Sequence, residues 1–252
     1  MAAAFRWPEL PKGDESKPFL DHLEDLRACL MQVIAALGVG VAVATPLAPR
    51  LMTLITRPLE SAAGSAGPFL RSLEVTGAFS LWMRLSVWAG VVFSVPGVLY
   101  AIGRFILPGL TAAEKRMLRR MGGMGILLFA AGVYLGYRAL PLAIKAMMAL
   151  HAWMRVRPEW TITSYIPFAM QVVLAFGLVF QMPVILLALG RLGLVRVSFL
   201  REKRRHVYVL IFILAAVLTP PEVVSQVIMA GALIGLYEIC IVLLGMKERA
   251  PR

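Results

Sequence analysis

Six apolar runs, each followed by a polar or basic segment, constrain this chain more than any other feature. A helix needs about 20 apolar residues to cross a bilayer, and the first four runs reach that length. The fifth and sixth are predicted to be too short to cross an average bilayer comfortably. The pattern predicts an all-α polytopic membrane protein with six transmembrane helices, at residues 28–47, 78–106, 121–140, 165–189, 207–218 and 222–244.

The composition supports this class and excludes others. Hydrophobic residues make up 60% of the chain and charged residues only 16%, whereas about a quarter of a soluble domain is charged. The net charge of +12 is spread between the apolar runs, which favours contact with anionic lipid over binding of nucleic acid. Cys29 and Cys240 lie in apolar runs without metal-ligand spacing. We therefore predict no metal site and no cofactor.

The apolar runs form one membrane domain over residues 1–252, with tails at 1–17 and 246–252. Residues 1–17 lack the apolar region of a signal peptide and are expected to form a loose tail. Apolar residues from Phe19 to Leu30 recur at helical spacing, which predicts an amphipathic interfacial helix. Pro46 and Pro49 are expected to end the first span, followed by a connector at 50–77. The bias of Lys and Arg predicts that both termini are cytoplasmic.

The segment between the second and third runs holds one acid among several bases. A turn at Pro108-Gly109 precedes Thr111, and Glu114 follows three residues later. A hydroxyl residue with a carboxylate three positions on is typical of a capping box at a helix start. On these residues alone, capping is the favoured role of Glu114.

Four polar or charged residues fall within apolar runs, where such groups usually face other helices or water. Arg138 lies near a span end, so its side chain is expected to reach the interface. The sequence leaves open whether Glu238 pairs with Arg84. It also leaves open whether Gln181, in the middle of the fourth run, makes a buried hydrogen bond or contacts another transmembrane helix.

No enzyme motif is found. The sequence lacks GxSxG, HExxH, Walker A and GxGxxG patterns in a suitable context. The three histidines are far apart and have no cluster of acids beside them. One candidate function is a small secondary transporter or channel, which six spans with broken helices would fit. Against that function, the sequence shows no internal repeat and no cluster of acids at the midplane.

Four motifs resemble the TatC family, the signal-peptide receptor of the twin-arginine translocase. They occur in the family's order and cover nearly the whole chain: HLEDLR at 22–27, SVPGVLYAIGRFILPGLTAAEKR at 94–116, YIPFAMQVVLAFGLVFQMPV at 165–184 and LTPPEVVSQ at 218–226. The resemblance implies a multi-pass protein of the plasma or inner membrane. It also implies that the protein recruits single-span TatA and TatB partners, works in a homo- or hetero-oligomer and transports folded precursors.

The same resemblance implies a site for the paired arginines of a signal peptide at the cytoplasmic face. In the family two acids make this contact, and they match Asp25 and Glu114 here. A guanidinium offers a planar fork of donors that a carboxylate accepts bidentately. Asp25 is one methylene shorter than the family's usual Glu, so the neighbouring Glu24 is a second candidate. The remaining residues assigned to this site are Phe105, Arg27 and Pro58.

Partner helices are expected at the last three spans. Thr219 and Gln226 match polar positions of the family where TatA and TatB dock, and Glu222 lies between them. Gln181 replaces a residue that is often Glu. We expect the bundle to be concave, with Gln181, Thr219 and Gln226 lining a partly wet face formed by the fourth to sixth spans.

Overall fold

The computed structural model describes residues 19–63, 70–71, 75–106, 112–219 and 222–249, and nearly all of them are helical. Three long helices come first, followed by a broken helix, a short helix pair and a final long helix. Their bounds are α1 Phe19–Ala63, α2 Gly77–Ile106, α3 Ala112–Trp153, α4 Ile162–Val179, α5 Met182–Arg191, α6 Val197–Glu202, α7 Arg204–Leu218 and α8 Val223–Arg249. The all-α class predicted from the apolar runs is confirmed.

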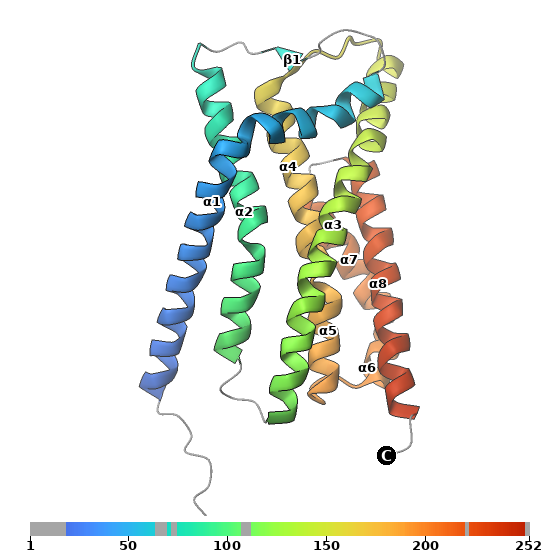
Figure 1. Ribbon diagram of the computed structural model, residues 1–252. Coiled ribbons are helices and arrows are strands. Elements are labelled where there is room, and N and C mark those ends of the chain that lie inside the picture. The colour runs from blue at the N-terminus through green and yellow to red at the C-terminus, as the bar shows by residue number, and fades with distance from the viewer. Residues whose placement is uncertain (1–18, 64–69, 72–74, 107–111, 220–221, 250–252) are drawn as a thin grey trace, which may run out of the picture.

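The long helices run up and down between two ends of an elongated bundle (Figure 1). We call the end where α1 begins and α8 finishes the basal end. The opposite end, where α3 finishes and α4 begins, is the distal end. The bounds of α2 match the predicted second span almost residue for residue. This agreement follows from clear boundary signals, since Gly77 begins the helix and Pro108-Gly109 follows it in the sequence.

The prediction that α1 ends at Pro46 or Pro49 is wrong. The helix continues to Ala63 and contains Pro46, Pro49 and Pro58. Figure 1 shows α1 rising from the basal end and then turning across the front of the bundle at the distal end. Proline bends a helix without always ending it, because neighbouring groups can satisfy the carbonyls that it leaves without a donor. We call the transverse part, Pro49–Ala63, the distal segment.

The beginning of α1 agrees with the expectation. The amphipathic stretch from Phe19 runs directly into the first span as one continuous helix. Its position in the membrane interface stays a prediction. At the distal end, two short parallel strands pair, β1 (Leu70–Arg71) and β2 (Trp160–Thr161), with Leu70 opposite Trp160.

The predicted fourth span is broken in its middle. Phe180 is the last cap residue of α4 and Gln181 the first of α5. Pro183 has no N–H to donate to the carbonyl four residues earlier, which explains a break at this place. Together α4 and α5 still form one apolar unit long enough to cross a membrane, Ile162–Arg191.

Among the described residues, five helical segments are long and apolar enough to span a membrane. The predicted fifth span corresponds to α7, which has 15 residues, and it is short as expected. The last helix is not short, because α8 has 27 residues and extends into the basic end of the chain. The basic segment 190–205 was expected to be a loop, yet it contains α6.

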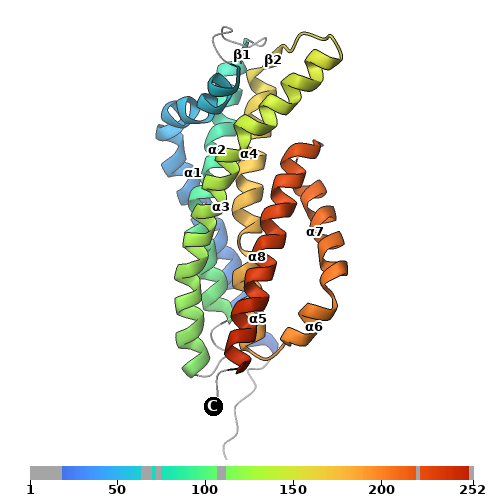
Figure 2. The same cartoon turned by 90° about the vertical axis from the view of Figure 1, so that its right-hand side faces the viewer.

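The core lies where α3, α4 and α8 pack together, and its largest fully buried side chains include Phe176, Met229 and Tyr237. Figure 2 shows α6 and α7 at the edge of the bundle, outside α8. The Tyr237 hydroxyl donates a hydrogen bond to the Leu200 carbonyl at 2.8 Å, which joins α8 to α6. The edge helices are therefore attached to the core mainly through α8.

Candidate functional site

Asp25 and Phe105 lie at the same level of the seam between α1 and α2. The Cys29 thiol contacts the Ala101 carbonyl at 3.6 Å, so these residues mark one level of the two antiparallel helices. Asp25 precedes Cys29 by one helical turn and Phe105 follows Ala101 by one turn, which puts both on the seam and nearer the basal end. Both side chains are half-buried. The structure thus brings these two predicted site residues together.

The neighbouring charged groups of α1 and α2 point outward. Glu24, Arg27 and Arg104 are exposed, in contrast to Asp25. Successive helical residues differ by about 100° in direction, so Glu24 and Asp25 cannot both face the seam. This geometry supports Asp25, rather than Glu24, as the acid that faces α2.

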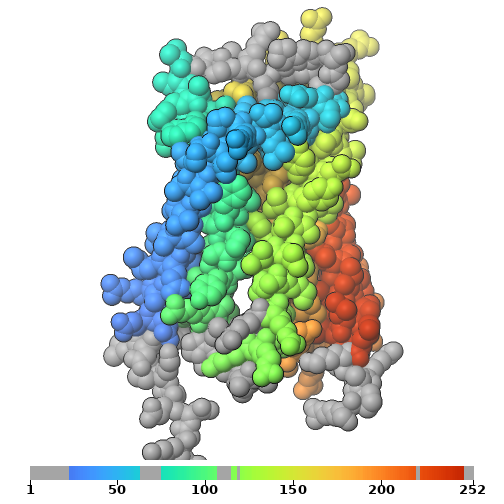
Figure 3. All heavy atoms as spheres, viewed as in Figure 1, coloured from blue at the N-terminus to red at the C-terminus, as the bar shows by residue number. Residues whose placement is uncertain are grey.

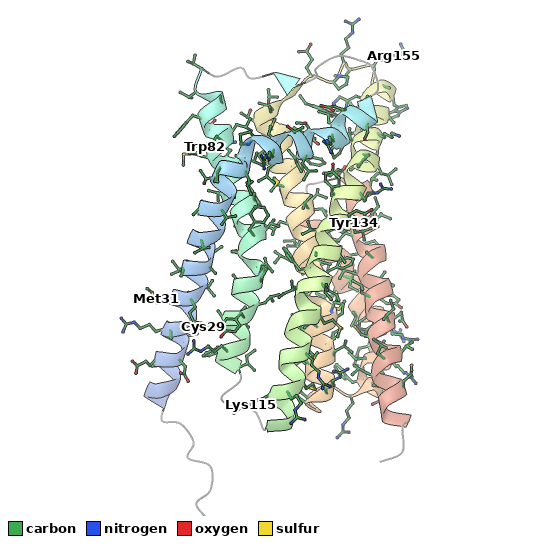
Figure 4. All side chains as sticks on the ribbon, viewed as in Figure 1. Cys29, Met31, Trp82, Lys115, Tyr134 and Arg155 are labelled. Carbon is green, nitrogen blue, oxygen red and sulfur yellow. The ribbon has the colours of Figure 1, made fainter. Side chains whose placement is uncertain are left out.

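Glu114 lies in the first turn of α3, which begins at Ala112. That turn is at the basal end, the same end as Asp25 (Figure 4). The side chain of Glu114 and the residue Thr111 lie outside the described part, so the predicted capping box stays a prediction. Lys115, labelled in Figure 4, is half-buried, and Arg116 is exposed.

Pro58 lies far from the other residues assigned to the peptide site. It is buried in the distal segment, 33 positions after Asp25 on the same helix. At about 1.5 Å per residue this separation amounts to roughly 50 Å of helix. The structure therefore does not bring Pro58 near Asp25.

Gln181 is nearly buried, with 9% of its surface exposed. Its side-chain amide donates a hydrogen bond to the Gly125 carbonyl of α3 at 3.0 Å, while its Oε1 has no partner among the described residues. A Cβ atom at Gly125 would lie 3.2 Å from that oxygen and 3.5 Å from Leu99 of α2. The absence of a side chain at Gly125 lets the amide reach the backbone.

Thr219, Glu222 and Gln226 gather where α7 ends and α8 begins. The Thr219 hydroxyl is buried and donates to the Ala215 carbonyl at 2.7 Å. The Gln226 amide donates to the Phe212 carbonyl at 3.3 Å and so links α8 to α7. These residues lie on the α7–α8 pair, whereas Gln181 points toward α3 and α2. The expectation that Gln181, Thr219 and Gln226 line one face is therefore wrong.

The face of the molecule that α1 crosses is hollowed. Figure 3 shows an opening between α2 and the basal half of α3, below the distal segment. The face of the fourth to sixth spans lies on the other side of this view, so the concave face expected there stays a prediction.

Two oxygens of Glu222 and the Ser225 hydroxyl are buried without a hydrogen-bond partner among the described residues. Burial raises the pKa of Glu222 above its ordinary value, and the nearby Ser225 hydroxyl partly opposes this effect. A desolvated carboxyl group favours its neutral form. Such a group is a good acceptor or donor for a polar residue brought by a partner.

Glu238 pairs with Arg204 rather than with Arg84. The Arg204 guanidinium donates to one Glu238 oxygen at 2.7 Å, and the Tyr208 hydroxyl donates to the other at 2.7 Å. Sequence reasoning missed Arg204 and Tyr208 as partners. The signal was available only in part: Arg204 precedes the apolar run 207–218 and Tyr208 lies at its start, but their distance from Glu238 along the chain hides the contact.

Comparisons with known proteins agree over most of the chain. The family model described as Sec-independent protein translocase protein (TatC) matches residues 21–231. A TatC protein of Desulforapulum autotrophicum is 33% identical over 92% of this chain and 86% of its own length. One of Aquifex aeolicus is 32% identical over 93% of this chain and 98% of its own length.

A solved structure gives the same result in three dimensions. The crystal structure titled twin arginine translocase receptor TatC has a TM-score of 0.78 and 31% identity, covering 90% of this chain and all of that chain. A second TatC crystal structure, in the detergent DDM, has a TM-score of 0.76, 31% identity, and coverage of 88% and 98%. Sequence, family model and fold thus converge, and this chain belongs to the TatC family of protein translocase components.

Proposed function

We propose that this receptor component of the twin-arginine translocase binds paired-arginine signal peptides at the basal end. The observation that carries the proposal is the meeting of Asp25 and Phe105 on the α1–α2 seam, at the end where α3 brings Glu114. The two carboxylates would each accept bidentate hydrogen bonds from one guanidinium. Phe105 would pack beside the peptide. The exposed Glu24 and Arg27 would border the site rather than form its centre.

The distribution of charge supports a cytoplasmic position for the basal end. More exposed bases of the described residues lie there than toward the distal end. They are Arg27, Arg104, Arg116, Arg120, Arg191, Arg196, Arg201, Arg204 and Arg205, against Arg50, Arg57, Arg84, Arg138, Lys145, Arg155 and Arg157. Basic residues of short segments remain on the cytoplasmic side of bacterial membranes. We therefore propose an inner-membrane protein with both termini in the cytoplasm.

A binding titration tests the peptide site. The full-length protein in nanodiscs is titrated with a fluorescent twin-arginine signal peptide and with the same peptide carrying two lysines. We expect Asp25→Asn and Glu114→Gln each to raise the Kd at least about tenfold, because each leaves a guanidinium without its charged acceptor. Glu24→Gln is the matched control and should change the Kd less than about twofold. Unchanged binding by the Asp25→Asn, Glu114→Gln double variant would overturn the proposal.

We further propose that single-span TatA- and TatB-type partners dock at two places. One is the distal end of the α7–α8 pair, with Thr219, Glu222 and Gln226. The apolar surface of α7 leads to it, where Val209 and Val217 are 61% and 74% exposed. The other is Gln181, whose Oε1 lies near Gly125 of α3 and has no hydrogen-bond partner within the described part of the chain. A transmembrane hydrogen bond to either place is worth about 1 kcal/mol.

Co-purification with a single-span partner separates these places. Gln226→Leu and Gln181→Leu should each reduce recovery of the partner and transport of a folded reporter, without changing the Kd of the signal peptide. Val242→Ala, at an exposed apolar position of α8, is the control. Full transport by both polar variants would exclude the proposed docking places.

A further inference from the structure

Two tyrosines of different helices donate hydrogen bonds to consecutive carbonyls of the distal segment. The Tyr137 hydroxyl of α3 donates to the Leu54 carbonyl at 3.1 Å. The Tyr165 hydroxyl of α4 donates to the Ile55 carbonyl at 2.7 Å, and this bond is buried. These are tertiary contacts across 83 and 110 positions of the chain. They attach the transverse part of α1 to the two helices that it crosses.

Pro58 explains why Leu54 needs such a donor. In a regular helix, the carbonyl of each residue accepts the N–H of the residue four positions later. Pro58 stands four positions after Leu54 inside α1 and has no N–H to give. Near a membrane, a carbonyl that loses its helical donor must be satisfied by a neighbouring group. Tyr137 supplies that group.

The Ile55 carbonyl differs in one respect. Its helical donor would be the N–H of Leu59, which Pro58 does not remove. Tyr165 therefore adds a second bond to a carbonyl whose ordinary donor still exists, whereas Tyr137 replaces a donor that is missing. The two tyrosines can thus be distinguished by restoring an N–H at position 58.

We propose that Tyr137 is a positioning residue that replaces the hydrogen-bond donor removed by Pro58, and that with Tyr165 it fixes the distal segment in the form that transport requires. Pro58 then acts through the shape of α1, without touching a signal peptide. The claim about transport rests on the proposed function. The claim about the Pro58–Tyr137 pair rests only on the geometry of the distal end.

A double-mutant cycle tests the pair by hydrogen–deuterium exchange of the full-length protein in nanodiscs. We expect Tyr137→Phe to speed the exchange of peptides from the distal segment roughly three- to tenfold, as loss of one hydrogen bond would. In a Pro58→Ala background the same change should have less than about a twofold effect, because the restored N–H satisfies Leu54. Tyr165→Phe should keep its effect in both backgrounds.

Tyr134→Phe is the matched control. Tyr134 lies on α3 close to Tyr137, is exposed (Figure 4), and has no hydrogen bond within the described residues. It should leave the exchange of the distal segment unchanged. Equal acceleration by Tyr137→Phe with and without Pro58 would overturn the proposed pairing, as would a Tyr137→Phe protein that exchanges no faster than this control.

The transport claim has its own readouts. Tyr137→Phe should lower transport of a folded reporter while leaving the Kd of the signal peptide unchanged. The Tyr137→Phe, Pro58→Ala double variant should transport as much of the reporter as the Pro58→Ala variant does alone. Normal transport by a protein whose distal segment exchanges faster would refute the positioning role. Failure of the basal peptide site would instead show in the Asp25 and Glu114 variants and would leave the exchange cycle unaffected.

Discussion

The helix pairs α1–α2 and α7–α8 are both joined within the membrane, but by different means. Small residues join the first pair: Gly90 lies so near α1 that a Cβ there would be 2.6 Å from the Val41 Cα. Polar side chains join the second, since α7 buries only Ile211 and Ala215. Lipid is as apolar as leucine, so helices associate through close packing or through hydrogen bonds. The α1–α2 pair relies mainly on close packing, and the α7–α8 pair relies mainly on hydrogen bonds.

This difference indicates which helix pair can exchange its internal contacts for contacts with a partner protein. Close backbone packing has no alternative arrangement that preserves the contact, so α1 and α2 should stay together. The helix α7 is held by hydrogen bonds that its Arg204 donates and that it accepts from Gln171 and Gln226. Each of these bonds can be exchanged for a hydrogen bond to a partner with similar groups. The α7 edge is thus the part of the molecule suited to reversible binding.

The largest effect is expected from Gly90→Ala, which tests the packed pair. The added methyl group would overlap the backbone of Val41 and should destabilise the protein by about 1–3 kcal/mol. Gly38→Ala is the control, because nothing lies within 4 Å of the Cβ that it adds. Thermal unfolding in detergent, followed by size-exclusion chromatography, should show a lower Tm for the first variant only. Equal Tm values would mean that close packing does not hold this pair.

A smaller effect is expected from Glu238→Gln, which tests the polar pair. It removes the ion pair with Arg204, whose side chain is 44% exposed, and Glu238 itself is 34% exposed. Solvent screening keeps the loss of stability below about 1 kcal/mol. The local effect should be clear: amide exchange in α7 should rise, with little change in α1. Glu202→Gln breaks the 3.3 Å pair with Lys203, where Glu202 is 72% exposed, and should change neither.

The smallest effect is expected from the pH dependence of Glu222. Burial raises its pKa above the ordinary value of 4.5, so the folded state disfavours the charged form. The resulting destabilisation is full above the raised pKa and disappears as the pH falls to the ordinary value. The protection factor near the start of α8, which is the intrinsic exchange rate at each pH divided by the observed rate, should therefore rise slightly as the pH is lowered through this window. Glu222→Gln, which cannot ionise, should remove the dependence; the same pH response in that variant would assign it to another group.

Much of the fold was predictable because its boundaries are local. Gly77 and Pro108-Gly109 mark the limits of α2, and the short apolar run of α7 is visible directly. The path of α1 was not predictable. Prolines usually interrupt helices, yet α1 continues past Pro46, Pro49 and Pro58. At Pro58 the missing donor is replaced by Tyr137, which is distant in the chain.

For the candidate sites as well, the residues were predictable from local sequence but their placement in space was not. Motif resemblance identified Asp25, Glu114 and Phe105, but their relative placement depends on the register between α1 and α2. The Cys29–Ala101 contact fixes that register, and no local pattern reveals it. The direction of Gln181 depends on a missing side chain at Gly125 on another helix. Glu238 could be recognised as unusual, but its partner Arg204 lies 34 positions away.

The shortness of α7 has a consequence for biogenesis. Its 15 residues rise about 22 Å, well below the roughly 30 Å of a hydrocarbon core. Its neighbour α8, to which the Arg204 side chain is bonded through Glu238, is synthesised later. While the chain leaves the ribosome, α7 alone is shorter than the hydrocarbon core. We therefore expect α7 to integrate together with α8, as one hairpin.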